Sequence, residues 1–294
     1  MADKLKLTDD QLRGLQLKEL GLLKYFSEFC ESHDLTYFVC GGCLIGSLRY
    51  GGFIPWDDDA DVFMPRADYE IFIREYLKEN PSERYVLLNE TDDTFTRNCF
   101  ATLVDTSATL VKNYQKDLDI PHGVAFDIFP LDARPDGKLA TYVQFFHCII
   151  YSLFRAQTVP EKHGGIMALG SKFLLGIFRS YKLRKKIWKR AERQMTKYNL
   201  DDCRCVCELC AGPRIMKNAY PKELFEKTTE ISFEGESFKA MRGYKKYLRL
   251  AFGEDYMTPP PEEERVVSHD LAYLDLDTPC SDSSFADVLQ NSFE

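Results

Sequence analysis

Apolar residues recur at intervals of three and four positions near the start of the chain, and they predict a long amphipathic helix over residues 9–32. Thr8 and Gln11 fit a capping box, which places the start of this helix. The apolar positions that make up its stripe are Leu12, Leu15, Leu22, Phe26 and Phe29. The helix is therefore expected to cover one face of a core.

Short apolar runs bounded by polar and turn residues follow this helix and predict strands. The runs at 60–64 and 123–129 matter most, because both contain acidic residues. The other expected strands are 35–40, 84–88, 99–105 and 108–113, and helical spacing predicts helices at 43–50 and 67–79. This order of elements predicts an α+β fold with a mixed β-sheet flanked by helices.

The pattern changes near residue 138, where longer stretches of helical spacing begin. Helices are expected at 139–157, 166–180, 182–198 and around 240–252, so the C-terminal half is expected to be largely helical. We divide the chain into a catalytic core with the N-terminal helix (1–135), a mostly helical region that completes the substrate pocket (136–275) and a polar tail (276–294).

The composition fits a globular protein with a sizeable core, since 45% of the 294 residues are hydrophobic and 29% are charged. A formal net charge of −8 argues against a surface that attracts polyanions as a whole, so no nucleic-acid partner is expected. The charged N-terminus lacks a secretory leader and no apolar run is long enough to span a bilayer, which indicates a cytoplasmic protein.

Four acidic residues crowd the segment between an apolar stretch and the expected strand at 60–64: Asp57, Asp58, Asp59 and Asp61. Adjacent carboxylates repel each other unless a cation or a hydrogen-bond donor compensates them. Side chains alternate along a strand, so Asp59 and Asp61 are expected to share one face. A solvated acidic turn is the alternative, but the apolar flanks imply partial burial, which bare carboxylates tolerate poorly.

Two further features suggest what the acids bind. Gly41 and Gly42 lie between an expected strand and a short helix, where the backbone comes close to a ligand and helix amides favour phosphate. Asp127 lies inside the apolar strand at 123–129. Together they predict a site that holds Mg²⁺, with Mn²⁺ as the alternative, against a nucleotide diphosphate, with Asp127 completing the metal site or accepting a proton.

Three blocks of the sequence resemble the LicD family: "YFVCGGCLIGSLRYGGFIPWDDDADVFMPRADYE", "HGVAFDIFPLD" and "GYKKYLRLAFGEDYMTPPP". The resemblance implies a nucleotidyltransferase-like fold. It also implies transfer of a phosphoalcohol, such as phosphocholine or a polyol phosphate, from a CDP-linked donor to a glycan hydroxyl with release of CMP. Asp59, Asp61 and Asp127 would be the catalytic and metal-binding residues. The donor would contact Gly41, Gly42, Cys43, Ser47, Arg49, Trp56 and Asp58.

Three positions depart from the family pattern. Cys43 replaces a common Thr or Ser, Tyr50 replaces the usual His, and Thr102 stands where a Lys is expected. These changes leave the acidic residues in place and bear on which donor is used. Two alternatives therefore stay open: a nucleotidyltransferase that releases pyrophosphate, and a nucleotide-binding protein of the same fold without activity.

Two segments outside these blocks carry their own hypotheses. Cys203, Cys205, Cys207 and Cys210 lack the paired spacing of ordinary zinc sites, so we interpret them as thiols buried in a strand. The basic segment 179–200 predicts a solvated helix face, with an anionic glycan or lipid headgroup as the alternative contact. With the apolar segments 143–154 and 166–178 it would form a peripheral dock for a lipid-linked acceptor at the inner membrane face. The pattern predicts no oligomeric state.

Overall fold

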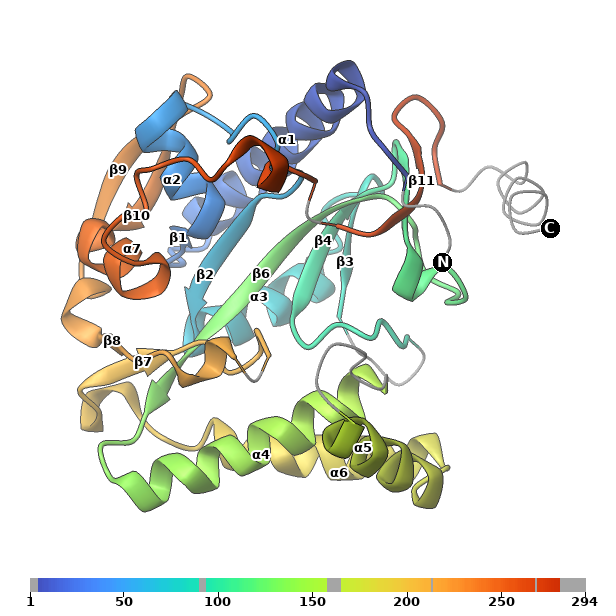
Figure 1. The fold of residues 1–294 in the computed structure, drawn as a ribbon, viewed down its shortest axis with the longest axis vertical. Coiled ribbons are helices and arrows are strands. Elements are labelled where there is room, and N and C mark those ends of the chain that lie inside the picture. The colour runs from blue at the N-terminus through green and yellow to red at the C-terminus, as the bar shows by residue number, and fades with distance from the viewer. Residues whose placement is uncertain (1–4, 90–93, 158–164, 213, 268, 281–294) are drawn as a thin grey trace.

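A mixed β-sheet forms the centre of the computed structural model and has helices around it (Figure 1). The structure describes residues 5–89, 94–157, 165–212, 214–267 and 269–280, so most of the expected polar tail lies outside the described residues. The elements of the first part are α1 (Asp9–Ser32), β1 (Phe38–Val39), α2 (Gly41–Tyr50), β2 (Asp61–Pro65), α3 (Arg66–Glu79), β3 (Tyr85–Leu88), β4 (Ala101–Asp105), β5 (Thr109–Lys112) and β6 (Val124–Arg134). The mixed sheet with flanking helices confirms the expected architecture.

The strands of the sheet follow the order β1-β2-β6-β4-β3. β2 and β6 run parallel, whereas β1 pairs with β2, and β4 with β6, in antiparallel fashion. Asp61 of β2 lies in register with Asp127 of β6, and Thr102 of β4 lies in register with Asp127 from the other side. Three polar residues from three neighbouring strands therefore line up across the sheet.

One face of this sheet is covered by α1 and α3, which pack against β2, β4 and β6. Phe26 of α1 contacts both Phe72 of α3 and Phe126 of β6, with ring centroids 5.1 and 5.3 Å apart. The alternation of β-strand side chains then turns Asp61 and Asp127 to the opposite face. The capping box predicted at Thr8 and Gln11 is present and starts α1.

β6 extends beyond the expected end at residue 129 and passes through Pro130. Its pairing with β4 ends at Ile128 and its pairing with β7 (Cys205–Cys207) begins at Asp132. Pro130, which has no N–H to donate, lies between these two stretches of pairing. A proline at this position is compatible with a long strand because the strand changes partner there.

The expectation of a largely helical C-terminal half is wrong. In the described part of the chain five strands lie beyond β6, and two of them, β9 and β10, form an antiparallel hairpin. Strand β11 pairs with β5 of the first half. The elements of this part are α4 (Lys138–Ala156), α5 (Gly165–Ile177), α6 (Tyr181–Met195), β7, β8 (Tyr220–Pro221), β9 (Thr228–Phe233), β10 (Glu236–Met241), α7 (Tyr244–Phe252) and β11 (Leu271–Asp275).

The hairpin has a local cause that the periodicity argument missed. Glu234 and Gly235 connect its strands with φ values of +54° and +81°. Two consecutive residues with positive φ produce the tight turn whose twist suits a two-residue hairpin, and an acid followed by glycine favours it. The division of the chain near residues 135 and 275 stays a prediction.

Helices α4, α5 and α6 form a separate layer at the bottom of the view in Figure 1, where α4 packs along α6. Its core includes Trp188, Tyr151 and Met195, which are buried. Within the described residues, no helix combines the length and the apolar character needed to cross a lipid bilayer.

Candidate active site

Asp127 is fixed by its neighbours on the open face of the sheet. The Thr102 hydroxyl donates to its Oδ1 at 2.8 Å, and the same hydroxyl accepts a hydrogen bond from the Asn98 amide at 2.8 Å. Thr102 thus has a structural role at the position where the resemblance leads one to expect a lysine. Asp61, one strand away, is half-buried and in register with Asp127. The two carboxylates repel each other, since Asp127 is among the charges that raise the pKa of Asp61.

The other acids gather in the segment just before β2. Asp57, Asp58 and Asp59 place carboxylate oxygens within 4.8 Å of one another. In the described part of the chain, no second group of three or more His, Cys, Asp or Glu side chains comes as close. Asp57 was not among the metal ligands expected from the sequence, and the structure brings it into contact with Asp59 through a side-chain hydrogen bond.

Electrostatic repulsion and burial shape the protonation of this cluster. Burial and then the Asp59 charge raise the pKa of Asp57 to about 8. Burial also raises the pKa of Asp59, although the charge of His269 opposes the shift. The pKa of Asp61 is raised well above its usual range by burial, followed by Asp59, Asp127 and Asp57. All three upward pKa shifts show that too little positive charge lies nearby to stabilise the ionised carboxylates.

Gly42 explains how Asp57 reaches this position. A Cβ atom at residue 42 would collide with the Asp57 carboxylate, so only glycine allows the acid to lie against the first turn of α2. The amide groups there favour a negative charge. Gly41 has φ of +51°, which favours glycine, and no atom lies within 4 Å of where its Cβ would be. The glycine pair thus allows one acid to approach and leaves open space beside it.

Two basic groups that the sequence-based site does not include lie next to the acids. Lys112 of β5 is buried, with its Nζ 3.9 Å from Asp127 Oδ2. Burial alone would lower the pKa of Lys112, but the charges around it, Asp127 foremost, raise it. The imidazole Nδ1 and the backbone N of His269 both lie 3.2 Å from Asp58 Oδ2. A lysine is therefore present near Asp127, although it comes from a different strand than expected.

Glu19 of α1 is a sixth acid at this site, and sequence reasoning missed it. It is 2% exposed, and its Oε2 has no hydrogen-bond partner. Burial, followed by the charges of Asp59 and Asp58, raises its pKa well above the usual range. A signal was available, because Glu19 lies at a position of the buried stripe between Leu15 and Leu22.

The structure gives several predicted donor-binding residues other partners. Ser47 donates to the Ser232 carbonyl at 2.8 Å, and Arg49 donates to the carbonyls of Tyr256 and Thr258. Both side chains therefore tie α2 to later parts of the chain. Their role in donor binding stays a prediction.

The remaining predicted donor contacts lie around the acids. Asp58 is buried and held by His269, and Cys43 is buried within α2. Trp56 is half-buried beside Tyr50, and the guanidinium of Arg265 lies 5.1 Å from its ring centroid. Direct contact of Cys43 with a donor phosphate is thus a prediction that would require movement in α2.

The carboxylates of the cluster suit a hard divalent cation as metal ligands. Asp57, Asp59, Asp61 and Asp127 offer only oxygen ligands, and Mg²⁺ prefers such ligands and usually takes only one or two carboxylates. Among the described residues, no lysine or arginine forms an ion pair with Asp57, Asp59 or Asp61, so these carboxylates are not neutralised by such salt bridges. Asp59, Asp61 and Asp127 remain the ligands we predict, with Asp57 as an addition from the structure.

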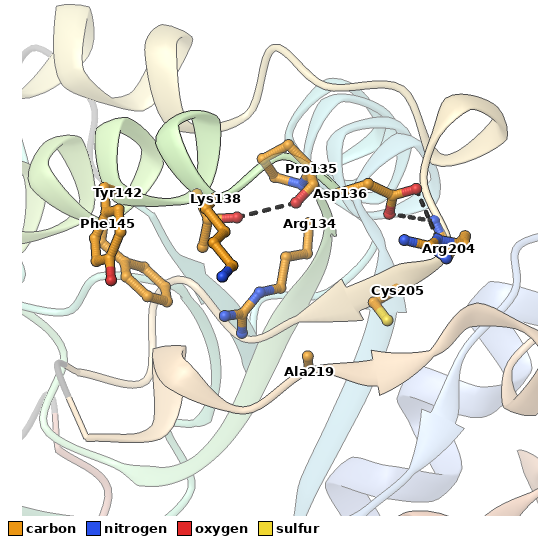
Figure 2. A pocket seen from close by; sticks show the side chains of 10 residues that line it. Arg134, Pro135, Asp136, Lys138, Tyr142, Phe145, Arg204, Cys205 and Ala219 are labelled. Carbon is orange, nitrogen blue, oxygen red and sulfur yellow. Dashed lines mark hydrogen bonds and ion pairs between the residues drawn. The ribbon is translucent and has the colours of Figure 1, made fainter.

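A cavity of about 490 Å³ lies at the other end of β6 and is separate from the acids (Figure 2). Arg134 and Lys138 point toward it, while Arg204 is paired with Asp136. Arg134 ends the strand that contains Asp127, so roughly 20 Å of extended backbone separates them. Side chains of this cavity therefore do not share reacting atoms with the acidic cluster.

The cysteine-rich segment has its own packing. Cys203, Cys207 and Cys210 are buried, and the Cys207 thiol donates to the Asp132 carbonyl at 3.6 Å. Cys205 belongs to the lining of the cavity in Figure 2. Of the four thiols interpreted as buried in a strand, Cys207 alone is both buried and in β7, because Cys205 is half-buried and the other two flank the strand.

Comparison with known proteins supports the resemblance noted in the sequence. Residues 34–138 match the LicD/FKTN/FKRP nucleotidyltransferase domain. The chain is 29% identical over 273 residues to the lipopolysaccharide cholinephosphotransferase LicD of Haemophilus influenzae, covering 88% of this chain and 96% of that protein. Uncharacterised proteins of Rickettsia typhi and Rickettsia prowazekii are 29% and 28% identical over 79 residues, which is 25% of this chain and 25% and 29% of theirs. The matched domain contains all the predicted site residues.

Proposed function

We propose that this chain, whose residues 34–138 match the LicD/FKTN/FKRP nucleotidyltransferase domain, transfers a phosphoalcohol from a CDP-linked donor to a glycan hydroxyl. Its homology to a cholinephosphotransferase extends over most of the chain and makes phosphocholine the first candidate for the transferred group. The observation that carries the proposal is the register of Asp61 with Asp127, beside the cluster of Asp57, Asp58 and Asp59.

The proposed reaction assigns a separate task to each acid. Asp59 and Asp61 would hold Mg²⁺, which when bound supplies positive charge to the diphosphate of the donor. Asp127, oriented by Thr102, would position the acceptor hydroxyl and accept its proton. The acceptor oxygen then bonds to the phosphorus that carries the alcohol, the bond from that phosphorus to the bridging oxygen breaks, and CMP leaves.

Lys112 has a positioning task in this proposal. Its ammonium group lies 3.9 Å from Asp127 Oδ2, on the side that Thr102 does not occupy. The opposite charges attract, so Lys112 would help to hold the Asp127 carboxylate in the orientation set by Thr102. It thus supplies at Asp127 a charge comparable to that of the lysine expected at position 102.

The identity of the small product tests the proposal. Incubation with CDP-choline and Mg²⁺ is expected to release CMP, slowly to water and faster with a glycan acceptor, as followed by chromatography. Chelation of the metal with EDTA should reduce the rate by at least about a hundredfold, since metal charge stabilisation supplies several kcal/mol. Added Mg²⁺ should restore the rate.

The two alternatives give different results in the same assay. Pyrophosphate in place of CMP, with a CTP donor, would indicate nucleotidyl transfer. Thermal stabilisation by CDP-choline and Mg²⁺ without product from any CDP-alcohol would indicate a binding protein. Either outcome would overturn the proposed transfer.

The helical layer suits an acceptor held at a lipid surface, which we include in the proposal. Five apolar side chains of α4 are exposed: Leu139, Tyr142, Val143, Phe146 and Ile149. The adjacent α6 presents a cluster of basic residues: Lys182, Lys185, Lys186, Lys189, Arg190 and Arg193. Apolar side chains beside positive charges favour the surface of an anionic bilayer.

Vesicle sedimentation tests this contact. The protein should pellet with vesicles that contain phosphatidylglycerol and remain in solution with phosphatidylcholine alone. Replacing Leu139 and Phe146 together by serine should lower the bound fraction at least about threefold, because both side chains would lose apolar burial in the interface. Leu17→Ser on α1 is the matched control, since Leu17 is also exposed. Equal binding of both variants would refute the assignment of the surface.

A further inference from the structure

A cavity of about 190 Å³ opens beside Asp61 on the open face of the sheet. Gly41 and Asp61 form its wall nearest to the acidic cluster. Phe63 and Phe129 follow Asp61 and Asp127 on the same face of β2 and β6 and continue this wall. The cavity therefore adjoins the position where the proposed reaction places the donor phosphates.

Aromatic rings from three parts of the chain line the cavity. Tyr247 of α7 packs nearly perpendicular to Phe63 and Phe252, with interplanar angles of 84° and 89°. Tyr220 of β8 meets Tyr247 at 70°, with ring centroids 5.1 Å apart. Rings at such angles form walls on several sides of a space, whereas a stack would leave one flat side.

Two acids and no basic residue are described in the lining of this cavity. Glu208, which follows β7, lines it together with Asp61, and among the described lining residues there is no lysine, arginine or histidine. Glu208 is 8% exposed and accepts a hydrogen bond from the Tyr220 hydroxyl at 2.8 Å. Burial raises the pKa of Glu208 to about 7, with the Tyr220 hydroxyl opposing the shift. A buried acid without a cationic partner is costly unless a ligand supplies the positive charge.

A ligand that suits this cavity is positive and has an apolar surface. Aromatic faces attract cations, and quaternary ammonium groups are recognised in this way by rings combined with an acid. A polyol would instead need several hydrogen-bonding groups. Among the lining residues Asn218 donates to Tyr220, whose hydroxyl already donates to Glu208, so few groups remain for a polyol.

We propose that this cavity binds the quaternary ammonium head of the transferred phosphoalcohol and that Glu208 is the counter-ion that selects it. The inference rests on the proposed function, because it places the phosphate of the same donor at Asp61. It adds a residue-level cause for the choice between a choline-like and a polyol donor. Glu208 acts in selection and takes no part in the bond changes.

Three donors and two variants test the proposal by kcat/KM for CMP release. The donors are CDP-choline, its uncharged carbon isostere CDP-3,3-dimethylbutanol, and CDP-glycerol. The wild-type protein should prefer CDP-choline to the isostere by at least about tenfold. Glu208→Gln keeps an acceptor for Tyr220 and removes the charge, so it should lower that preference about tenfold, mainly through KM for CDP-choline. The rate with the isostere should stay within about twofold.

The second variant examines the aromatic walls. Phe252 is 49% exposed at the rim of the cavity, so Phe252→Leu is expected to fold and to weaken CDP-choline use several-fold. Matched controls are Glu223→Gln, an exposed acid, and Phe173→Leu, an exposed ring, and neither should change the preference. Unaltered preference in Glu208→Gln, or equal use of CDP-glycerol and CDP-choline by the wild type, would overturn the proposal.

Direct binding separates this inference from the proposed function. Titration calorimetry with phosphocholine and Mg²⁺ should show binding that weakens about tenfold in Glu208→Gln, and 3,3-dimethylbutyl phosphate should bind both proteins equally. If no CDP-alcohol yields CMP but this difference appears, the transfer reaction is refuted and the ammonium site stands. If CMP appears and the difference does not, the transfer reaction stands and the ammonium site is refuted.

Discussion

Replacing Asp61 with asparagine is expected to lower the rate of phosphoalcohol transfer about a thousandfold or more while the protein remains folded. Asp61 is one of the predicted metal ligands, and loss of metal charge stabilisation worth several kcal/mol corresponds to a change of that size. The measurement is kcat/KM for CMP release from CDP-choline at saturating Mg²⁺. Asp119→Asn, at an exposed position outside the cluster, is the control and should retain wild-type activity.

A stability measurement tests whether the same variant acts through loss of the metal. The pKa of Asp61 is raised by burial, followed by repulsion from Asp59, Asp127 and Asp57. At neutral pH the unfolded chain ionises this group freely, so the shift lowers the stability of the metal-free folded protein. Asp61→Asn should therefore melt at an equal or higher temperature than the wild type in EDTA, and should gain less from added Mg²⁺. Near-normal transfer by this variant would contradict the assigned ligand.

Replacing Asp132 with alanine is expected to cause the largest loss of stability among the substitutions considered, about 3–5 kcal/mol. Asp132 of β6 is 1% exposed and accepts two hydrogen bonds from Arg66 of α3, at 2.7 and 2.6 Å. Removing the acid leaves the Arg66 guanidinium partly buried without its partner. The Tm, measured by circular dichroism or calorimetry, should fall on the order of 10 °C.

The exposed pair between Arg204 and Asp136 provides the matched control. Its side chains are 83% and 41% exposed, so Asp136→Ala should cost less than about 1 kcal/mol. A double variant with Arg66→Met and Asp132→Leu should recover much of the lost stability, because no buried charge is then left unpaired. If Asp132→Ala and Asp136→Ala had similar Tm values, burial of the first pair would not be the cause of its strength.

Local sequence patterns were sufficient to predict most elements of the first half of the chain. The stripe of apolar residues and the capping box located α1, and short apolar runs located β2, β4 and β5 to within a few residues. The strand expected at 123–129 is shorter than β6, which continues through Pro130 to Arg134. A proline stops pairing only where its missing N–H is needed, and the change of partner from β4 to β7 is a tertiary property.

In the C-terminal half, hydrophobic periodicity alone detects the long helices and misses the short strands. The long helices α4, α5 and α6 dominated the pattern, whereas β7 and β8 are too short to produce one. The hairpin of β9 and β10 did carry a local signal in Glu234 and Gly235. Turn chemistry was therefore the neglected evidence for this part of the fold.

The acidic cluster could be recognised from the sequence, but its surroundings could not. Alternation along a strand was expected to place Asp59 and Asp61 on one face, but β2 begins at Asp61, so Asp59 lies in the segment before the strand. Glu19, Lys112 and His269 join the site from α1, β5 and the segment before β11. Their proximity results from long-range packing, and no spacing within a local motif reveals it. The catalytic and donor-binding roles of the site residues stay predictions.

The pairing of β11 with β5 brings one of the last described segments of the chain back to the acidic cluster. His269 precedes β11 and contacts Asp58, so this group reaches its position only after the chain up to β11 is available. On a translating ribosome the sheet with Asp61 and Asp127 emerges long before this segment does. The nascent protein consequently carries these acids without their His269 contact until the segment before β11 has been synthesised.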